Sequence, residues 1–211
     1  DPSAGRMALR LLRQLKLTER IKLLLEQAGL KWPPARLVHA SLALLLAGFS
    51  ATWYGKPAYR AAALPLGAVL GALPFVYVLR LRSERLRKFE EQFPESLEFL
   101  SRSMRAGHAF SVSLALIHSE FREPLAGEFR RAYEEQNLGL PLEVALANMA
   151  QRVPSMDVHF FVSAVVLQKR TGGNLAELLD KLASLIRERF KLRGRIRAIS
   201  AHGKMTGVVL S

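Results

Sequence analysis

The chain has 211 residues, half of them apolar, and it carries a formal net charge of +13 and no cysteine. The absence of cysteine excludes disulfides and thiolate zinc sites. Two long apolar runs lie outside the most regular part of the sequence. The composition therefore indicates a membrane protein with one soluble domain.

Charge is unevenly distributed along the chain. Residues 1–88 contain 15 Lys and Arg against 4 Asp and Glu, residues 89–184 contain 9 against 13, and residues 185–211 contain 7 against 1. A nucleic-acid-binding protein concentrates positive charge on its folded domain. Here the middle region is slightly acidic and the basic residues flank apolar runs, as on the cytoplasmic side of membrane proteins. We expect no nucleic-acid partner.

Residues 1–36 are predicted to form basic amphipathic helices, one over 6–17 and one that is capped by Thr18 and ends at Gly29. Two interpretations carry equal weight. The helices could lie at the lipid head groups of a membrane. They could instead be surface helices packed on the bundle or on a partner.

Residues 37–79 are predicted to form a transmembrane hairpin. Segments 37–55 and 61–79 each contain 19 residues without Asp, Glu, Lys or Arg. As helices they would each extend about 28 Å, close to the thickness of a bilayer's apolar core. Eight basic residues precede the first segment and five follow the second, against two in the turn around Pro57. This asymmetry predicts that both ends are cytoplasmic.

Small residues at Ala63, Gly67 and Gly71 are spaced by four on the second segment. Such a stripe lets another helix approach closely. We slightly favour the first segment of the same chain, with Gly48, as the partner over another subunit.

After a basic juxtamembrane linker at 80–92, residues 93–204 repeat one pattern three times: Gly, an apolar residue three positions later and Leu four positions after that. The glycines are Gly107, Gly139 and Gly172, the last followed by Gly173. Each can end a helix in a left-handed cap. Pro124 and Pro154 mark the returns between them. The pattern predicts six antiparallel helices at 94–106, 111–122, 124–137, 141–152, 155–171 and from 174 onward.

The predicted fold class is therefore all-α: a transmembrane helical hairpin followed by a cytoplasmic six-helix antiparallel bundle. We expect helix 155–171 at the bundle centre, because it is apolar nearly all round from 160 to 167. The last helix should run without a break from Asn174 to Lys204 and project beyond the bundle. Residues 205–211 are predicted to begin a further, truncated transmembrane helix.

Three runs carry a resemblance to a known family: Phe-Pro-Glu-Ser-Leu-Glu-Phe-Leu at 93–100, Met-Arg-Ala-Gly-His at 104–108, and Thr-Gly-Gly-Asn-Leu-Ala-Glu at 171–177. They resemble the type II secretion system F domain, in the form found in the TadB-like platform protein of the tight-adherence (Tad, type IVc) pilus. The resemblance covers most of residues 18–211.

The resemblance implies a multi-pass protein of the bacterial inner membrane whose main domain is cytoplasmic. It implies a non-enzymatic platform that couples a hexameric secretion ATPase to pilin assembly, together with a second, TadC-like platform subunit. Membrane lipids and homo- or hetero-oligomeric contacts are further expected partners. The alternatives are the platform subunit of a different type IV pilus or type II secretion system, or a membrane-anchored enzyme with an unrecognised site.

No chemistry of its own is evident in the sequence. The Gly-Lys pair at Gly203-Lys204 lacks the first glycine and the Ser or Thr of a phosphate-binding loop. The five histidines show no metal-ligand spacing. We therefore predict no catalytic residue, no metal site and no cofactor.

The candidate partner site lies at the glycine turns. Alternating helix directions bring the three turns to one end of the bundle, which the membrane topology would place far from the bilayer. We predict that this end binds the ATPase and that the following residues contribute: Arg105, His108, Asn137, Lys169, Arg170 and Asn174. Cations are also favoured in last helical turns by the helix dipole alone.

Overall fold

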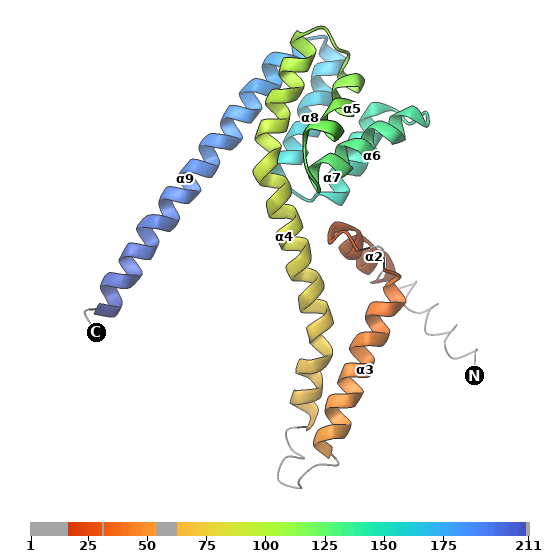
Figure 1. Ribbon diagram of the computed structural model, residues 1–211, viewed down its shortest axis with the longest axis vertical. Helices are drawn as coiled ribbons and strands as arrows, with labels where there is room; N and C mark the ends of the chain where they lie inside the picture. Colours follow the sequence, from red (N-terminus) through yellow and green to blue (C-terminus); the bar gives the residue numbers. More distant parts are fainter. Residues whose placement is uncertain (1–16, 31, 54–62, 210–211) are drawn as a thin grey trace. The chain divides into compact units, whose positions relative to one another are not determined.

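The computed structural model describes residues 17–30, 32–53 and 63–209, and every element in these ranges is a helix (Figure 1). The all-α fold class is confirmed. The chain divides into two compact units, Asp1–Arg87 and Lys88–Ser211. The predicted helix up to residue 16 and the predicted turn around Pro57 lie outside the described ranges.

The first unit contains α2 (Leu17–Gln27), α3 (Pro34–Trp53) and the first part of α4 (Ala63–Arg105). Leu25 of α2 is buried with Leu37 of α3 and Val78 of α4. The Arg82 Nε donates a 2.7 Å hydrogen bond to the side chain of Gln27. Helix α2 is thus packed on α3 and on the first part of α4.

Glycines set the distance between α3 and α4. A Cβ atom built on Gly67 would lie 3.0 Å from the carbonyl oxygen of Leu45, and one on Gly71 would lie 3.2 Å from that of Ser41. A Cβ on Gly48 would lie 3.2 Å from the Cα of Gly67. The two backbones therefore meet where side chains are missing, and the nearest partner of Gly67 and Gly71 is the same chain. The side chain of Ala63 lies outside the described residues.

Both helices of this pair are long and apolar enough to cross a membrane, over Pro34–Thr52 and within Leu64–Arg105. Most of their large apolar side chains are exposed. Water-soluble proteins rarely expose apolar patches of that extent, so the surface suits lipid. The exposed apolar residues on the two helices are Val38, Leu42, Leu44, Leu45, Leu46, Leu64, Leu66, Val69, Leu73, Phe75, Val76, Tyr77 and Leu79.

Helix α4 runs without a break through Pro94, so the helix start predicted there is wrong and residues 80–92 are helical. Proline removes one backbone hydrogen bond from a helix interior. Here Phe89, Phe93, Leu97 and Leu100 line one face of α4 and are at most 1% exposed. Their burial stabilises the helix across the proline. Local sequence signals do not reveal this burial.

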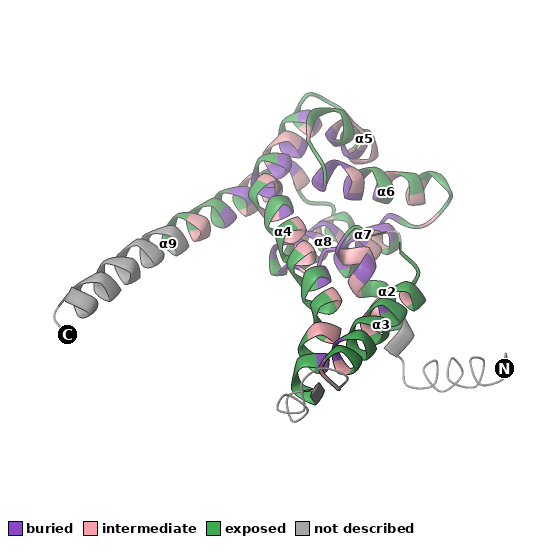
Figure 2. Cartoon of the chain, turned by 60° about the horizontal axis from the view of Figure 1, so that its bottom comes forward, coloured by how far each residue is buried: buried purple, intermediate pink, exposed green. Residues whose placement is uncertain are grey.

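The second unit continues with five helices after α4. Their bounds lie within three residues of the predicted ones at both ends, apart from the longer last helix: α5 (Phe110–Glu120), α6 (Leu125–Asn137), α7 (Leu142–Arg152), α8 (Met156–Thr171) and α9 (Leu175–Val209). Rings of Phe93, Phe129 and Phe161 form the centre, with centroids 5.7 to 6.5 Å apart. Buried residues gather where these helices face one another (Figure 2).

Helix α8 is not the central helix that its composition predicted. Val158, Phe161 and Val165 are buried, whereas Phe160 is 51% and Leu167 is 62% exposed. Only one side of α8 meets the core, where Phe161 shares the centre with Phe93 of α4 and Phe129 of α6. The remaining apolar face points outward.

Helix α9 is continuous from Leu175 to Val209, as predicted. Its buried residues end at Ile186, and none of its described side chains from 187 to 192 is buried. The last part of the helix projects from the bundle (Figure 1). Arg187 hydrogen-bonds Glu98 of α4 at 2.7 Å, and Arg189 pairs with the buried Asp157 of α8.

A buried ion cluster joins α6 to α7. The guanidinium of Arg152 lies 2.7 Å from Glu128 and 2.7 Å from Glu135, and its side chain is 7% exposed. Asn148 donates a 2.8 Å hydrogen bond to Glu135. A charge this buried is stable only when paired and hydrogen-bonded, so this cluster fixes how the two helices pair.

Candidate functional site

Three glycine turns form the candidate site, and each has the left-handed backbone predicted for it. The φ angles are 96° at Gly107, 97° at Gly139 and 74° at Gly172. The N–H of His108, the residue after Gly107, donates to the carbonyl of Ser103. The residue after Gly139 donates in the same way to the helix before it. These bonds satisfy the last carbonyls of a helix.

Side-chain contacts bring the three turns to one end of the second unit, here called the glycine end. Gln136, just before Gly139, donates a 2.7 Å hydrogen bond to Ser111, just after Gly107. Lys169, just before Gly172, lies 3.1 Å from Glu143, just after Gly139. Helix α4 also finishes here, at Arg105.

Two of the predicted cations are already paired within the domain. Arg105 pairs with Asp180 of α9, although 58% of its side chain stays exposed. Lys169 pairs with Glu143 and is 50% exposed. Backbone hydrogen bonding at Glu143 and the Lys169 ammonium hold the pKa of that carboxyl below its usual range. These two cations therefore stabilise the site as well as lending it charge.

The other predicted residues are exposed at the same end: His108, Asn137, Arg170 and Asn174. The side-chain oxygen of Asn174 accepts a 3.2 Å hydrogen bond from the Glu177 N–H, so this residue caps α9. Gly173 packs against the side chain of Gln168, since a Cβ there would lie 2.1 Å from its amide nitrogen. This amide is the far end of a flexible side chain, which can move aside, and the three turn glycines have open space around them.

An apolar component of this end was missed from the sequence. Leu138 is 83% exposed, and Val112 and Val144, in the first turns of α5 and α7, are 45% and 44% exposed. In the glycine cap the hydrophobic contact is made by the residue after the glycine, here Leu140. Leu138, which precedes the glycine, does not take part in this contact and stays exposed. The cap pattern at 138–140 is the sequence signal that could have predicted its exposure.

The glycine end presents an exposed leucine, exposed cations and three left-handed glycine turns. Within the described residues no group of His, Asp and Glu could hold a metal ion.

The chain thus combines an apolar helical hairpin with a helical bundle. Residues 96–211, more than half of the chain, match the family described as type II secretion system (T2SS), protein F. The chain belongs to this family. Its members are inner-membrane platform proteins of type II secretion and type IV pilus machines, and they work with secretion ATPases and other platform components. No curated protein and no solved structure matches the chain significantly.

Proposed function

We propose that this chain is the inner-membrane platform subunit of a Tad-type pilus, in which it couples a cytoplasmic secretion ATPase to pilin assembly. The family supports the platform role. The Tad assignment rests on the Thr-Gly-Gly-Asn-Leu-Ala-Glu run at 171–177 and on the basic helix that follows it. The platform subunit of another type IV pilus or type II secretion system is the second candidate, since the family match supports it equally.

One observation carries the ATPase proposal. Helix α4 enters the second unit at Lys88 and ends at Arg105, so the glycine end is opposite to the end where the chain enters from the apolar hairpin. If the hairpin spans the membrane, a cytoplasmic motor meets the glycine end first. Leu138 would enter an apolar pocket of the ATPase, with Arg170 as a charge partner.

The pairing and exposure of the side chains decide which variants suit a test. Reversing Arg105 would also break its pair with Asp180, so a loss of binding could come from a disturbed bundle. Leu138→Asp and Arg170→Glu change side chains that are exposed. We expect the double variant to remain in the membrane and to lose ATPase co-purification and pilus assembly. Leu185→Asp, on an exposed leucine of α9, is the control and should retain ATPase binding.

A second platform subunit is proposed to cover the outward apolar face of α8 and α9. Met156, Phe160 and Leu167 lie on one side of α8, since they are spaced by four and seven residues, and each is more than half exposed. Leu185 and Leu192, seven residues apart on the adjoining α9, are 62% and 56% exposed. Phe160→Glu with Leu167→Glu should abolish co-purification of the second subunit and preserve that of the ATPase. Loss of the ATPase instead would contradict this division of surfaces.

A further inference from the structure

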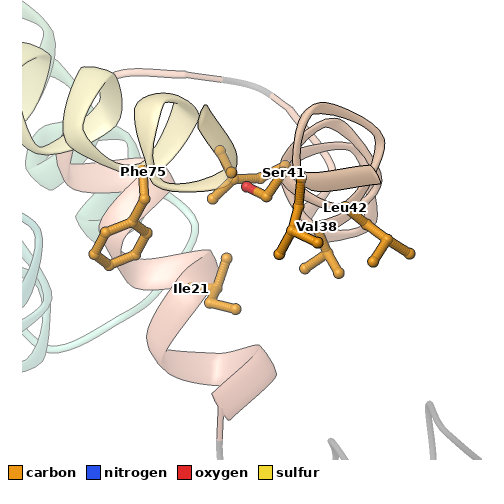
Figure 3. Close-up of a pocket in the computed structure, with 8 residues that line it drawn as sticks. Ile21, Val38, Ser41, Leu42 and Phe75 are labelled. Atoms are coloured by element: carbon orange, nitrogen blue, oxygen red, sulfur yellow. The ribbon is translucent and has the colours of Figure 1, made fainter. Parts of the chain in front are cut away.

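A cavity of about 310 Å³ lies in the first unit among α2, α3 and α4 (Figure 3). The side chains of Ile21 from α2 and Phe75 from α4 extend into the same space (Figure 3). Ser41 is the one polar residue in its lining, which consists of Ile21, Leu37, Val38, Ser41, Leu42, Leu45, Gly71 and Phe75. A ligand in this cavity would have to be apolar.

The position of the cavity along the helices matches the outer part of a membrane's apolar core. Ser41 lies five residues after Arg36, and Phe75 lies five residues before Arg80. At a rise of 1.5 Å per residue both are about 7.5 Å from the basic boundary of their helices. In a bilayer this is the level of the acyl chain just below its head group.

Exposed cations are the sequence neighbours of two residues that line the cavity, Ile21 and Leu37. Arg20 and Lys22 flank Ile21 on α2 and are exposed, as is Arg36 at the start of α3. Glu19 is also exposed, but it lies two residues before Ile21. Its position is therefore rotated by about 200° around the helix axis, to the other side of α2. Basic residues at this depth attract the anionic lipids of a membrane surface.

The helical stripe that could receive another membrane helix is already occupied. Gly67 and Gly71 face α3 of the same chain, with its backbone 3.0 to 3.3 Å from the position of a Cβ. The cavity is instead lined on its α2 side by Ile21. A single flexible chain fits such a short space better than a helix does.

We propose that this cavity holds one acyl chain of an anionic phospholipid, whose phosphate lies among Arg20, Lys22 and Arg36. The bound lipid would hold the amphipathic helix α2 against the hairpin. This site rests on the proposed insertion of α3 and α4 in a membrane, and nothing in the platform role requires it.

The full chain would be reconstituted in phosphatidylcholine vesicles that contain a trace of phosphatidylglycerol with a photoactivatable group on its acyl chain. Adducts would be mapped by mass spectrometry after illumination. We expect adducts at Ser41, Leu42 and Phe75 to exceed those at Leu46 and Val76 several-fold, although Leu46 and Val76 are each 54% exposed outside the cavity. Photoactivatable phosphatidylcholine should give no such enrichment.

Two pairs of variants sharpen this test. Leu42→Trp fills the cavity and should remove the enrichment at Ser41 and Phe75, whereas Leu46→Trp should leave it unchanged. Lys22→Gln with Arg36→Gln should remove the preference for phosphatidylglycerol, whereas Arg102→Gln with Arg130→Gln in the second unit should not.

Adducts spread evenly over exposed span residues, or enriched equally with both lipids, would overturn the lipid site while leaving membrane insertion intact. Cross-links from the cavity residues to a second protein chain would overturn it in favour of a helix partner. Absence of adducts from the whole of 34–53 and 64–79 would overturn insertion itself, and with it the proposed platform topology.

Discussion

The apolar hairpin and the bundle use glycine for opposite physical reasons. In the first unit Gly67 and Gly71 have no left-handed backbone, but a Cβ at either would press on the backbone or side chains of α3. In the second unit Gly107 and Gly139 have open space where a Cβ would lie, but their φ angles exceed 90°. Glycine thus gives close helix approach in the apolar hairpin and a sharp chain reversal in the bundle.

The same contrast extends to what holds the helices together. Where α3 and α4 meet, the contact is between backbones and small apolar groups, as in membrane helix pairs. Helices α6 and α7 are joined by the long side chains of Arg152, Glu128 and Glu135. The two units should therefore be sensitive to different substitutions. An added side chain should disturb the α3–α4 contact most, and the loss of a charged side chain should disturb the α6–α7 contact most.

The largest effect is expected at Gly67. Gly67→Leu and Gly67→Asn should both force α3 away from α4, since the first added atom would already lie 3.0 Å from the Leu45 carbonyl oxygen. We expect little monodisperse protein in mild detergent from either variant, measured by size-exclusion chromatography. Normal yield and elution of both would show that close approach is not required.

Arg152 should rank next. Arg152→Met removes the guanidinium that two carboxylates share, and breaking a buried ion pair costs about 3–5 kcal/mol. Arg130→Met breaks the exposed pair with Glu134, for which about 0–1 kcal/mol is expected. Amide hydrogen exchange in α6 and α7 of the full chain would measure both. Equal protection in the two variants would contradict a structural role for the buried cluster.

A smaller loss of stability is expected from substitutions at Gly139. Comparing them with substitutions at Gly67 separates the need for a left-handed backbone from the need for close approach. Gly139→Ala places an ordinary residue in a left-handed conformation, at about 1–2 kcal/mol, whereas Asn tolerates that conformation. Asn should therefore be the better replacement at Gly139 and give no advantage at Gly67. The measurement is the thermal unfolding midpoint of each variant, and a larger loss for Asn than for Ala at Gly139 would contradict the assignment.

The smallest effect concerns the pH dependence of the pair between Glu143 and Lys169. Because the pKa of Glu143 is lowered in the folded chain, its stabilising contribution is fully present above the ordinary value of 4.5 and is lost as the pH falls through the lowered value. Glu143→Gln should cause a slight loss of thermal stability at neutral pH. Parent and variant should converge in strongly acidic buffer; a difference that grows on acidification would have the wrong sign.

The sequence predicted what depends on local chemistry. Glycines with an apolar residue three positions later marked the helix ends, so most of the bundle's boundaries and its three turns could be predicted. Asn174, at the predicted start of the last helix, caps that helix. The gathering of the three turns at one end followed from the alternating directions of successive helices.

What depends on packing could not be predicted. The continuity of α4 through Pro94 depends on phenylalanines that become buried only in the folded bundle. The outward face of α8 depends on how much of the core other helices fill. The exposed Leu138, the buried Arg152 cluster and the cavity beside Phe75 all result from contacts between residues far apart in the sequence.

The most direct test of the central claim is photo-cross-linking in living cells from single positions in the full chain. A photoreactive amino acid would replace Leu138 at the glycine end or, as the control, the exposed Arg122 just beyond α5, at the other end of that helix. We predict a covalent adduct between the secretion ATPase and the Leu138 position and none from the Arg122 position. An ATPase adduct from Arg122 without one from Leu138 would contradict docking at the glycine end.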